Sequence, residues 1–139
     1  MFTLTVRDHM MIAHSLPDPF FGPAQNLHGA TYVVETTWSR PVLDEHGVVM
    51  DIGVANDLLA GVLDGLRYRN LDEHPDFAGR LSTTEVLAQY VTERLAAGAA
   101  FVEGLERLTV TLRETPDAWA SYTLELPVLS ERGGPAPAR

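Results

Sequence analysis

The first part of the chain alternates between apolar and polar residues. Apolar residues recur at even-numbered positions, which are Phe2, Leu4, Val6, Met10 and Ile12. This period of two predicts a long strand with one buried face, and it places His14 on that same face. A second strand is predicted over about 28–38, because this stretch is rich in Thr, Val and Tyr. Residues 15–27 contain prolines and glycine and are predicted to form a loop.

Helical spacing replaces this alternation in the middle of the chain. A first apolar stripe consists of Ala55, Leu58, Leu59, Val62, Leu63 and Leu66, which recur every three or four residues. It predicts a helix that begins near Val54. Residues 82–85 read Ser-Thr-Thr-Glu, the spacing of a capping box, and predict a second helix that runs to about Ala97. The polar stretch 67–80 separates the two helices.

Alternation returns near the end of the chain. Leu108, Val110 and Leu112 share one face, residues 115–117 predict a turn, and residues 118–126 alternate again as a hairpin partner. The order is therefore two strands, two helices and two strands. It predicts an α+β fold with one four-stranded antiparallel sheet and both helices on one face.

The length of the chain is typical of a single domain. We expect residues 1–129 to form that domain and residues 130–139, with their Gly-Gly-Pro sequence, to be a disordered C-terminal tail. A four-stranded sheet leaves two open edges, which proteins pair or cover. Edge pairing between copies, closing a barrel, is one way to cover them.

Composition and charge exclude several functions. Ten basic and nineteen acidic residues give a net charge of −9, which argues against nucleic acid or an anionic membrane as the main partner. Every basic residue is arginine, and cysteine is absent, so Schiff-base lysines, thiolate nucleophiles and zinc–thiolate sites are excluded. The first residues lack the apolar core of a signal peptide, and no stretch approaches the ~18 apolar residues of a membrane span. We therefore expect a cytoplasmic protein.

Glu114 is the most informative polar residue in the pattern. Alternation places it on the same face as Leu108, Val110 and Leu112, at the end of an apolar strand face. A carboxylate buried there would need a partner. The alternative is a strand-end glutamate that turns into solvent.

Five short motifs occur in order along the chain. They are Ala13-His14-Ser15-Leu16, Leu27-His28-Gly29, Gly47-Val48-Val49-Met50-Asp51, Asn70-Leu71-Asp72 with Ser82-Thr83-Thr84-Glu85, and Arg113-Glu114-Thr115. With these motifs the chain resembles the 6-pyruvoyl-tetrahydropterin synthase family, including the 6-carboxy-tetrahydropterin synthases, from about Phe2 to Leu126. The resemblance implies the tunnelling fold, in which trimers close a β-barrel and two trimers stack as a hexamer.

The resemblance also implies a zinc ion held by three histidines, and here the chain departs from the family. The matching positions are His14, His28 and Ala30. A catalytic zinc normally keeps three protein ligands, so we expect no metal and no other cofactor, unless a long loop supplies the third donor. The alternative for the two histidines is that they are polar residues lining a cavity.

The positions that match the family's proton-transfer residues are also changed. Ala24 stands at the position of a cysteine, and Arg67-Tyr68 replaces an Asp-His pair. Arginine cannot act as a base, and a phenol needs strong perturbation to do so. We therefore predict no catalytic residues and no synthase activity. The alternative is a metal-independent enzyme that acts on a pterin side chain, with Arg67 or Tyr68 in its site.

The positions that match the family's recognition residues are retained. The family glutamate that corresponds to Glu114 accepts from the ring N–H and the exocyclic amine of the pterin, which suits a carboxylate with two acceptor oxygens. Thr83 and Thr84 match threonines that add contacts at the start of a helix. The resemblance thus implies that the protein binds a pterin-like or purine-like heterocycle. An alternative role for Thr83, Thr84 and Glu85 is that of a helix cap only.

Overall fold

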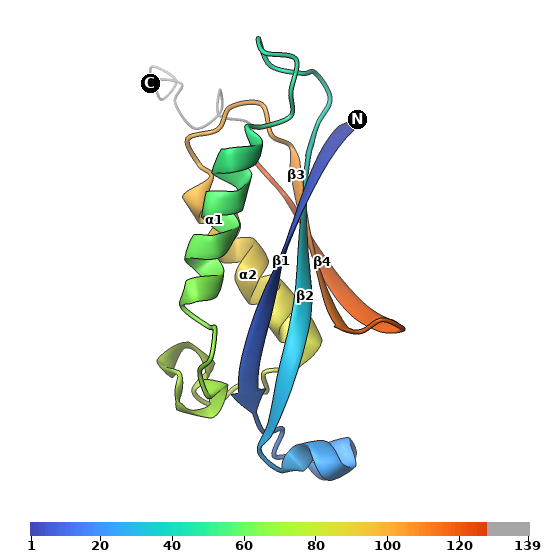
Figure 1. The fold of residues 1–139 in the computed structure, drawn as a ribbon, viewed down its shortest axis with the longest axis vertical. Helices are drawn as coiled ribbons and strands as arrows, with labels where there is room; N and C mark the ends of the chain where they lie inside the picture. Colours follow the sequence, from blue (N-terminus) through green and yellow to red (C-terminus); the bar gives the residue numbers. More distant parts are fainter. Residues whose placement is uncertain (128–139) are drawn as a thin grey trace, which may run out of the picture.

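Four strands form one antiparallel sheet in the order β1-β2-β3-β4. The computed structural model describes residues 1–127, so the predicted tail at 130–139 lies outside the described residues. The strands are β1 (Phe2–His14), β2 (His28–Arg40), β3 (Arg107–Thr115) and β4 (Ala118–Glu125). β1 pairs with β2 along its whole length, from Phe2 opposite Arg40 to His14 opposite His28. Figure 1 shows these two strands running side by side through the molecule.

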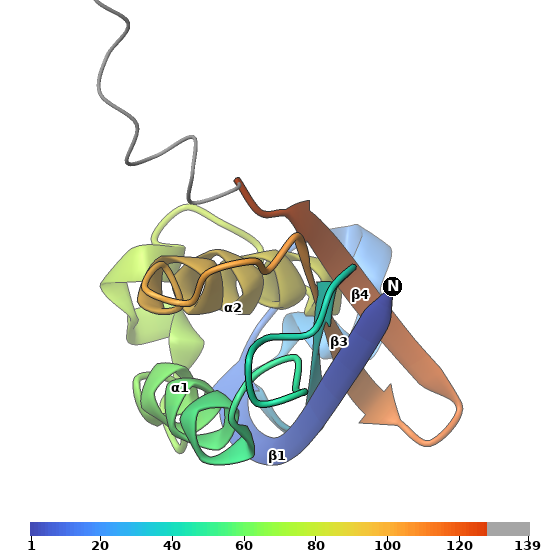
Figure 2. The ribbon, with the colours of Figure 1, turned by 90° about the horizontal axis from the view of Figure 1, so that it is seen from above.

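Two helices cover one face of this sheet. They are α1 (Ile52–Asp64) and α2 (Thr84–Gly98). Seen from above in Figure 2, both lie on the same side of the strands. The predicted α+β arrangement, with strands and helices in the order ββααββ, is confirmed.

The core lies between the helices and the even-numbered face of the sheet. α1 buries Ala55, Leu59 and Leu63, which recur every four residues along one stripe. α2 likewise buries Leu87, Val91 and Leu95. From the sheet, the largest fully buried side chains are Trp38, Tyr32, Met10, Ile12, Leu108 and Leu112. The alternation of β1, β2 and β3 therefore sets which side chains meet the helices.

The two helices begin at residues other than those the sequence predicts. α1 begins at Ile52 because the side chain of Asp51 accepts a hydrogen bond from the Val54 amide at 3.0 Å. In α2 the N-cap is Thr83, whose hydroxyl accepts from the Val86 amide at 3.2 Å. The predicted capping box that begins at Ser82 is wrong by one residue, because the Ser82 side chain is buried and bonds elsewhere.

The connections contain short 3-10 helices that the polar pattern does not predict. Residues 15–27, predicted as a loop, include η1 (Pro19–Gln25), with Asp18 as its N-cap and a proline at its first position. The polar stretch after α1 contains η2 (Leu71–Glu73) and η3 (Pro75–Phe77). Asn70 also forms an isolated parallel bridge with Ala13, so this stretch lies along part of the outer edge of β1.

The face of the sheet away from the helices is rich in hydroxyl and charged groups. Thr5 and Thr37 share a hydrogen bond of 2.8 Å across β1 and β2, and Thr109 and Thr123 do the same across β3 and β4. In the described part of the chain, no helix is long and apolar enough to cross a membrane.

Candidate functional site

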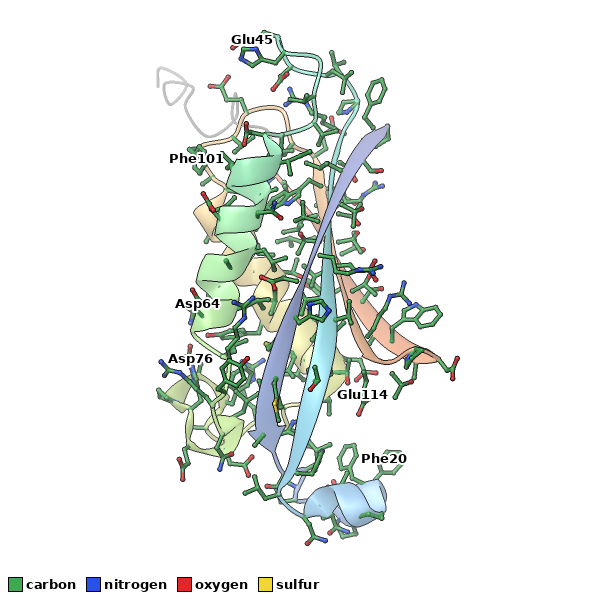
Figure 3. The ribbon with its side chains drawn as sticks, in the orientation of Figure 1. Phe20, Glu45, Asp64, Asp76, Phe101 and Glu114 are labelled. Atoms are coloured by element: carbon green, nitrogen blue, oxygen red, sulfur yellow. The ribbon has the colours of Figure 1, made fainter. Side chains whose placement is uncertain are left out.

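A cavity of about 310 Å³ opens where the end of β1 and the start of β2 meet the start of α2 and the turn of the β3–β4 hairpin. Its walls are formed by His14, Leu16, Phe21, Ala24, His28, Tyr32, Thr83, Thr84, Glu85, Glu114, Ala118, Trp119 and Ala120. In Figure 3 the labelled Glu114 lies in the lower half of the view, and η1, with Phe20, lies below it. The cavity therefore draws on residues from all four strands, the β1–β2 connection and the start of α2.

Glu114 lies at an irregularity in β3. The register between β3 and β4 shifts between Arg113, which pairs with Trp119, and Thr115, which pairs with Ala118. Glu114 is the extra residue of this β-bulge, a device that redirects a side chain. It lines the cavity and is solvent-exposed. The sequence thus predicted its face correctly, but the carboxylate is exposed and not buried, and the bulge could not be read from alternation.

Thr83 and Thr84 both line the cavity, but their hydroxyls do different things. The Thr83 hydroxyl caps α2. The Thr84 hydroxyl donates to Oε2 of Glu114 across 3.4 Å. A purely capping role accounts for Thr83 and leaves the orientation of Thr84 toward Glu114 unexplained.

Tyr32 is a cavity residue that the sequence analysis did not single out. It is almost fully buried, and its hydroxyl forms a hydrogen bond with Thr84. Burial is the main cause that raises the pKa of this phenol above its usual value. Tyr32, Thr84 and Glu114 thus form a chain of polar contacts along one wall. Counting in steps of two from His28 places Tyr32 on the same face of β2, and this could have indicated Tyr32 as a cavity residue.

The aromatic wall of the cavity is also absent from the sequence analysis. Trp119 lines the cavity, and the Arg113 guanidinium lies 4.4 Å from the centre of its ring. Glu35 accepts hydrogen bonds from Arg113 and, at 3.1 Å, from Arg7. The hydrogen bond from Arg113 is the main cause that lowers the pKa of Glu35. Trp119 therefore contacts Arg113, which belongs to a charged cluster on the helix-free face.

His14 and His28 lie side by side in the wall of the cavity. Their ring centres are 4.6 Å apart in an edge-on arrangement. Nδ1 of His14 lies 3.0 Å from the buried Ser82 hydroxyl, and Nδ1 of His28 lies 2.8 Å from the Asn26 carbonyl oxygen. Burial, followed by the neighbouring His28, lowers the pKa of His14. In each ring, Nδ1 is thus already in contact with a polar group of the protein.

These histidines do not form a three-ligand metal site with any other residue that the structure describes. Ala30 lies beside Ile12 in the ladder, on the same face as His28, and offers no donor. Among residues 1–127, no group of three or more His, Asp or Glu side chains could hold a metal ion. A catalytic zinc needs three protein ligands. The donor set of this cavity therefore does not fit such an ion.

The other two changed positions lie in different places. Ala24 lines the cavity. The Arg67 side chain instead forms ion pairs with Asp8 and Asp64, and the Tyr68 side chain is 84% exposed. Neither Arg67 nor Tyr68 lines the cavity of its own chain.

Comparison with known proteins shows which proteins this chain is similar to. The model of the family described as 6-pyruvoyl tetrahydropterin synthase matches residues 3–125. The chain belongs to this family. Its membership confirms the resemblance that the five motifs indicated, and it relates the protein to the synthases of pterin metabolism.

Individual relatives cover most of the chain. The 6-carboxy-5,6,7,8-tetrahydropterin synthase of Bacillus subtilis is 30% identical over 129 residues, covering 87% of this chain and 84% of the relative. The 6-pyruvoyl tetrahydrobiopterin synthase of Drosophila melanogaster is 31% identical over 132 residues, covering 86% of this chain and 77% of the relative.

Solved structures of the family have the same fold. The 6-pyruvoyl tetrahydropterin synthase of Caenorhabditis elegans superposes with a TM-score of 0.72 at 28% identity, covering 87% of this chain and 94% of that one. The synthase of Plasmodium falciparum superposes with a TM-score of 0.74 at 15% identity, covering 90% and 98%. The predicted tunnelling fold is therefore confirmed at the level of one chain.

Proposed function

We propose that this family member binds a pterin-like or purine-like heterocycle in the cavity at Glu114 and does not catalyse the synthase reaction. The observation that carries the proposal is the carboxylate of Glu114, which lies at the β-bulge, lines the cavity and accepts from Thr84 at 3.4 Å. Thr83 and Thr84 are the other two residues that we assign to ligand binding. Family membership supports the choice of ligand.

The chemistry of the wall suits such a ligand. A pterin presents a ring N–H and an amine side by side, and an ionised carboxylate can accept from both at once. Thr84 contacts Glu114, and Tyr32 in turn contacts Thr84. The flat apolar part of the heterocycle would meet Leu16, Phe21 and Trp119. The cavity thus combines one charged acceptor with a largely apolar enclosure.

The absence of synthase activity is proposed from the donor set and the replaced residues. His14 and His28 lack a third ligand, and Ala24 offers no proton-transfer group. The alternative is a metal-independent enzyme that acts on a pterin side chain with Arg67 or Tyr68, which would have to reach the cavity of another copy because neither lines the cavity of its own chain. We accordingly propose no cofactor.

The proposal includes an assembly and a location. β1 and β4 are the edge strands of the described sheet, and pairing them between copies would close a barrel. We propose a homo-hexamer built as a dimer of trimers, located in the cytoplasm. The net charge of −9 argues against nucleic acid and against an anionic membrane surface as partners.

The role of Glu114 is tested by calorimetry with neopterin on three variants. Glu114→Ala should weaken binding by roughly tenfold to a few hundredfold, because two ligand donors lose their acceptor. Glu114→Gln should also weaken it, because one amide donor then faces a ligand donor. Glu45→Gln, which makes the same charge change in an exposed loop at the far end of Figure 3, should bind like wild type.

Wild-type protein that binds neopterin, together with a Glu114→Gln variant that binds it equally well, would show that Glu114 is only a surface carboxylate. The same wild-type sample should not convert dihydroneopterin triphosphate to the product of the synthases. Conversion at an enzymatic rate would contradict the proposed loss of activity.

A further inference from the structure

Arg40, the last residue of β2, is a buried arginine at the end of the sheet opposite the Glu114 cavity. It pairs with Phe2 at one end of the β1–β2 ladder, whereas His28 of the cavity lies at the other end. In Figure 1 the N-terminus lies at this end of the sheet. Only 9% of Arg40 is exposed. Burying a charge costs free energy unless it is paired or hydrogen-bonded, so this guanidinium requires polar partners.

The protein supplies only part of what this guanidinium can bind. Nε of Arg40 donates to the carbonyl oxygen of Val42 at 2.6 Å, and Nη1 donates to the carbonyl oxygen of Val49 at 3.2 Å. The second N–H of Nη1 and both N–H bonds of Nη2 have no acceptor among residues 1–127. No carboxylate in that part of the chain forms an ion pair with Arg40. Its charge is therefore balanced by two carbonyl dipoles and by no anion in direct contact.

A hollow of about 160 Å³ lies beside this guanidinium. Its walls are formed by Arg40, Pro41, Val42, Gly104, Leu105 and Glu106. Within the described residues, the buried side-chain nitrogen and oxygen atoms without a partner are Oγ1 of Thr36 and Nε1 of Trp38. Nη2 of Arg40 is not one of them, although it has no acceptor there, so solvent reaches this nitrogen. Its free N–H bonds therefore open onto the hollow.

Gly104 leaves the space that the guanidinium occupies. Its φ is +83°, and a Cβ built on it would lie 3.0 Å from Cζ of Arg40 and closer still to Nη2. Another residue would be strained at this φ, and its side chain would press on the guanidinium. The glycine thus keeps the charged end of Arg40 at the edge of the hollow.

Two carboxylates near the hollow limit the charge that it can accept. Glu106 lines it. Asp44 is near enough for the charge of Arg40 to help lower the pKa of that carboxyl, although the hydrogen bond from the Val48 amide is the main cause. Both carboxylates repel a second anion, and this repulsion grows with the charge of the anion. A singly charged group therefore suits the hollow better than a phosphate does.

We propose that the hollow at Arg40 binds a single carboxylate group. The remaining N–H bonds of Nη1 and Nη2 can donate to the two oxygens of one carboxylate, an arrangement that guanidinium groups favour. The carboxylate belongs to a small organic acid in solution or to Glu131, the first acidic residue after the described part of the chain. The chain reaches this wall at Leu126, whose amide donates to the carbonyl oxygen of Glu106 at 2.8 Å. The site is independent of the function proposed for the Glu114 cavity.

The experiment titrates the full chain with sodium acetate in place of sodium chloride, so that the ionic strength stays constant. The buffer is at pH 6.5, where acetate is ionised. The readout is the Nε–H signal of Arg40 in protein labelled with 15N-arginine, assigned through its contact with Val42. Acetate should shift this signal in a saturable manner. It should not shift the signal of Arg69, an exposed arginine that does not line the hollow.

Two glutamate variants with the same change in net charge test the hollow without altering Arg40. Glu106→Gln removes a negative charge from the wall, so it should tighten acetate binding severalfold. Glu103→Gln changes an exposed residue of the same connection that does not line the hollow, and it should bind acetate like wild type.

A third variant, Glu131→Gln, distinguishes the two sources of the carboxylate. If acetate shifts the Arg40 signal equally in this variant and in wild type, the ligand is a free acid. If acetate acts more strongly in the variant, or only there, the glutamate of the chain itself occupies the site. An Arg40 signal that acetate moves in neither protein would overturn the proposal. So would a Glu106→Gln variant that binds acetate no better than Glu103→Gln, and Arg40 would then only anchor the connection after β2.

Discussion

Glu114 shows how the end of a strand can supply a site residue. Strict alternation places it on the face of Leu108, Val110 and Leu112, and the bulge leaves it without a partner in β4. Its carboxylate meets Thr84 and, through Thr84, Tyr32. The position of the acceptor therefore depends on three segments that are distant in the sequence.

Ala30 is the residue that decides whether the histidine pair can hold zinc. Purified wild-type protein should contain no stoichiometric zinc, because two imidazoles form an incomplete site. Ala30→His should bind zinc far more tightly, since residue 30 shares a face with His28 and neighbours His14 diagonally across β1 and β2. Elemental analysis after dialysis measures both.

The matched control for this variant is Thr31→His, which adds a histidine to the opposite face of β2. It should not raise zinc content. Wild-type protein that retains about one zinc per chain, or an Ala30→His variant no better than Thr31→His, would contradict our interpretation of the histidine pair.

Glu35 makes the stability of the protein depend on pH. Its pKa lies below the ordinary value of 4.5, chiefly because Arg113 donates to it. A carboxyl whose pKa is lower in the folded state stabilises the protein above its unfolded pKa, and this stability is lost as pH falls through the folded pKa. The free energy of unfolding should therefore drop as pH falls below 4.5. Urea titrations of Glu35→Gln should show a shallower drop in this range.

At the scale of elements, the start of α2 serves both the fold and the cavity. Thr83 caps the helix, Thr84 contacts Glu114, and Ser82 contacts His14. Three consecutive hydroxyls thus have three different partners. A change in this segment affects stability or the site depending on which hydroxyl is removed.

Thr83→Ala should lower the free energy of unfolding by about 1 kcal/mol, because an uncapped N–H is left at the helix start. Thr84→Ala is the matched control. Its hydroxyl makes no bond to the helix backbone in the described structure, so stability should change by less than about half as much. Urea unfolding followed by circular dichroism compares the two. Equal losses in both variants would show that Thr83 is not the cap.

Periodicity predicted the elements and missed the local exceptions. The alternation of β1, β2 and β3 and the stripes of α1 and α2 follow from burial on one face, which repeats over many residues. The bulge at Glu114, the cap at Thr83 and the 3-10 helix η1 depend on single hydrogen bonds and turns, which leave little trace in a hydrophobic pattern. For the same reason the sequence identified Glu114 as a candidate but did not indicate Tyr32 or Trp119.

At the scale of the whole molecule, the two open edges of the sheet are the feature that bears on assembly. β1 and β4 each have one side without a strand partner in the described sheet, apart from the short bridge at Ala13. Such edges favour pairing with another copy. Native mass spectrometry at micromolar concentration should find hexamers, with trimers appearing first on dissociation. A stable monomer under these conditions would contradict the proposed assembly.

The threonines on the helix-free face would determine what the interior of such an assembly is like. In a barrel with the helices outside, these hydroxyls and the Arg113–Glu35 pair would face the lumen. Hydroxyl and charged groups keep water, so the lumen would be a hydrated channel and would contribute little hydrophobic energy. Cohesion between subunits would come from main-chain hydrogen bonds at the strand edges. The centre of such a particle would then admit small polar solutes.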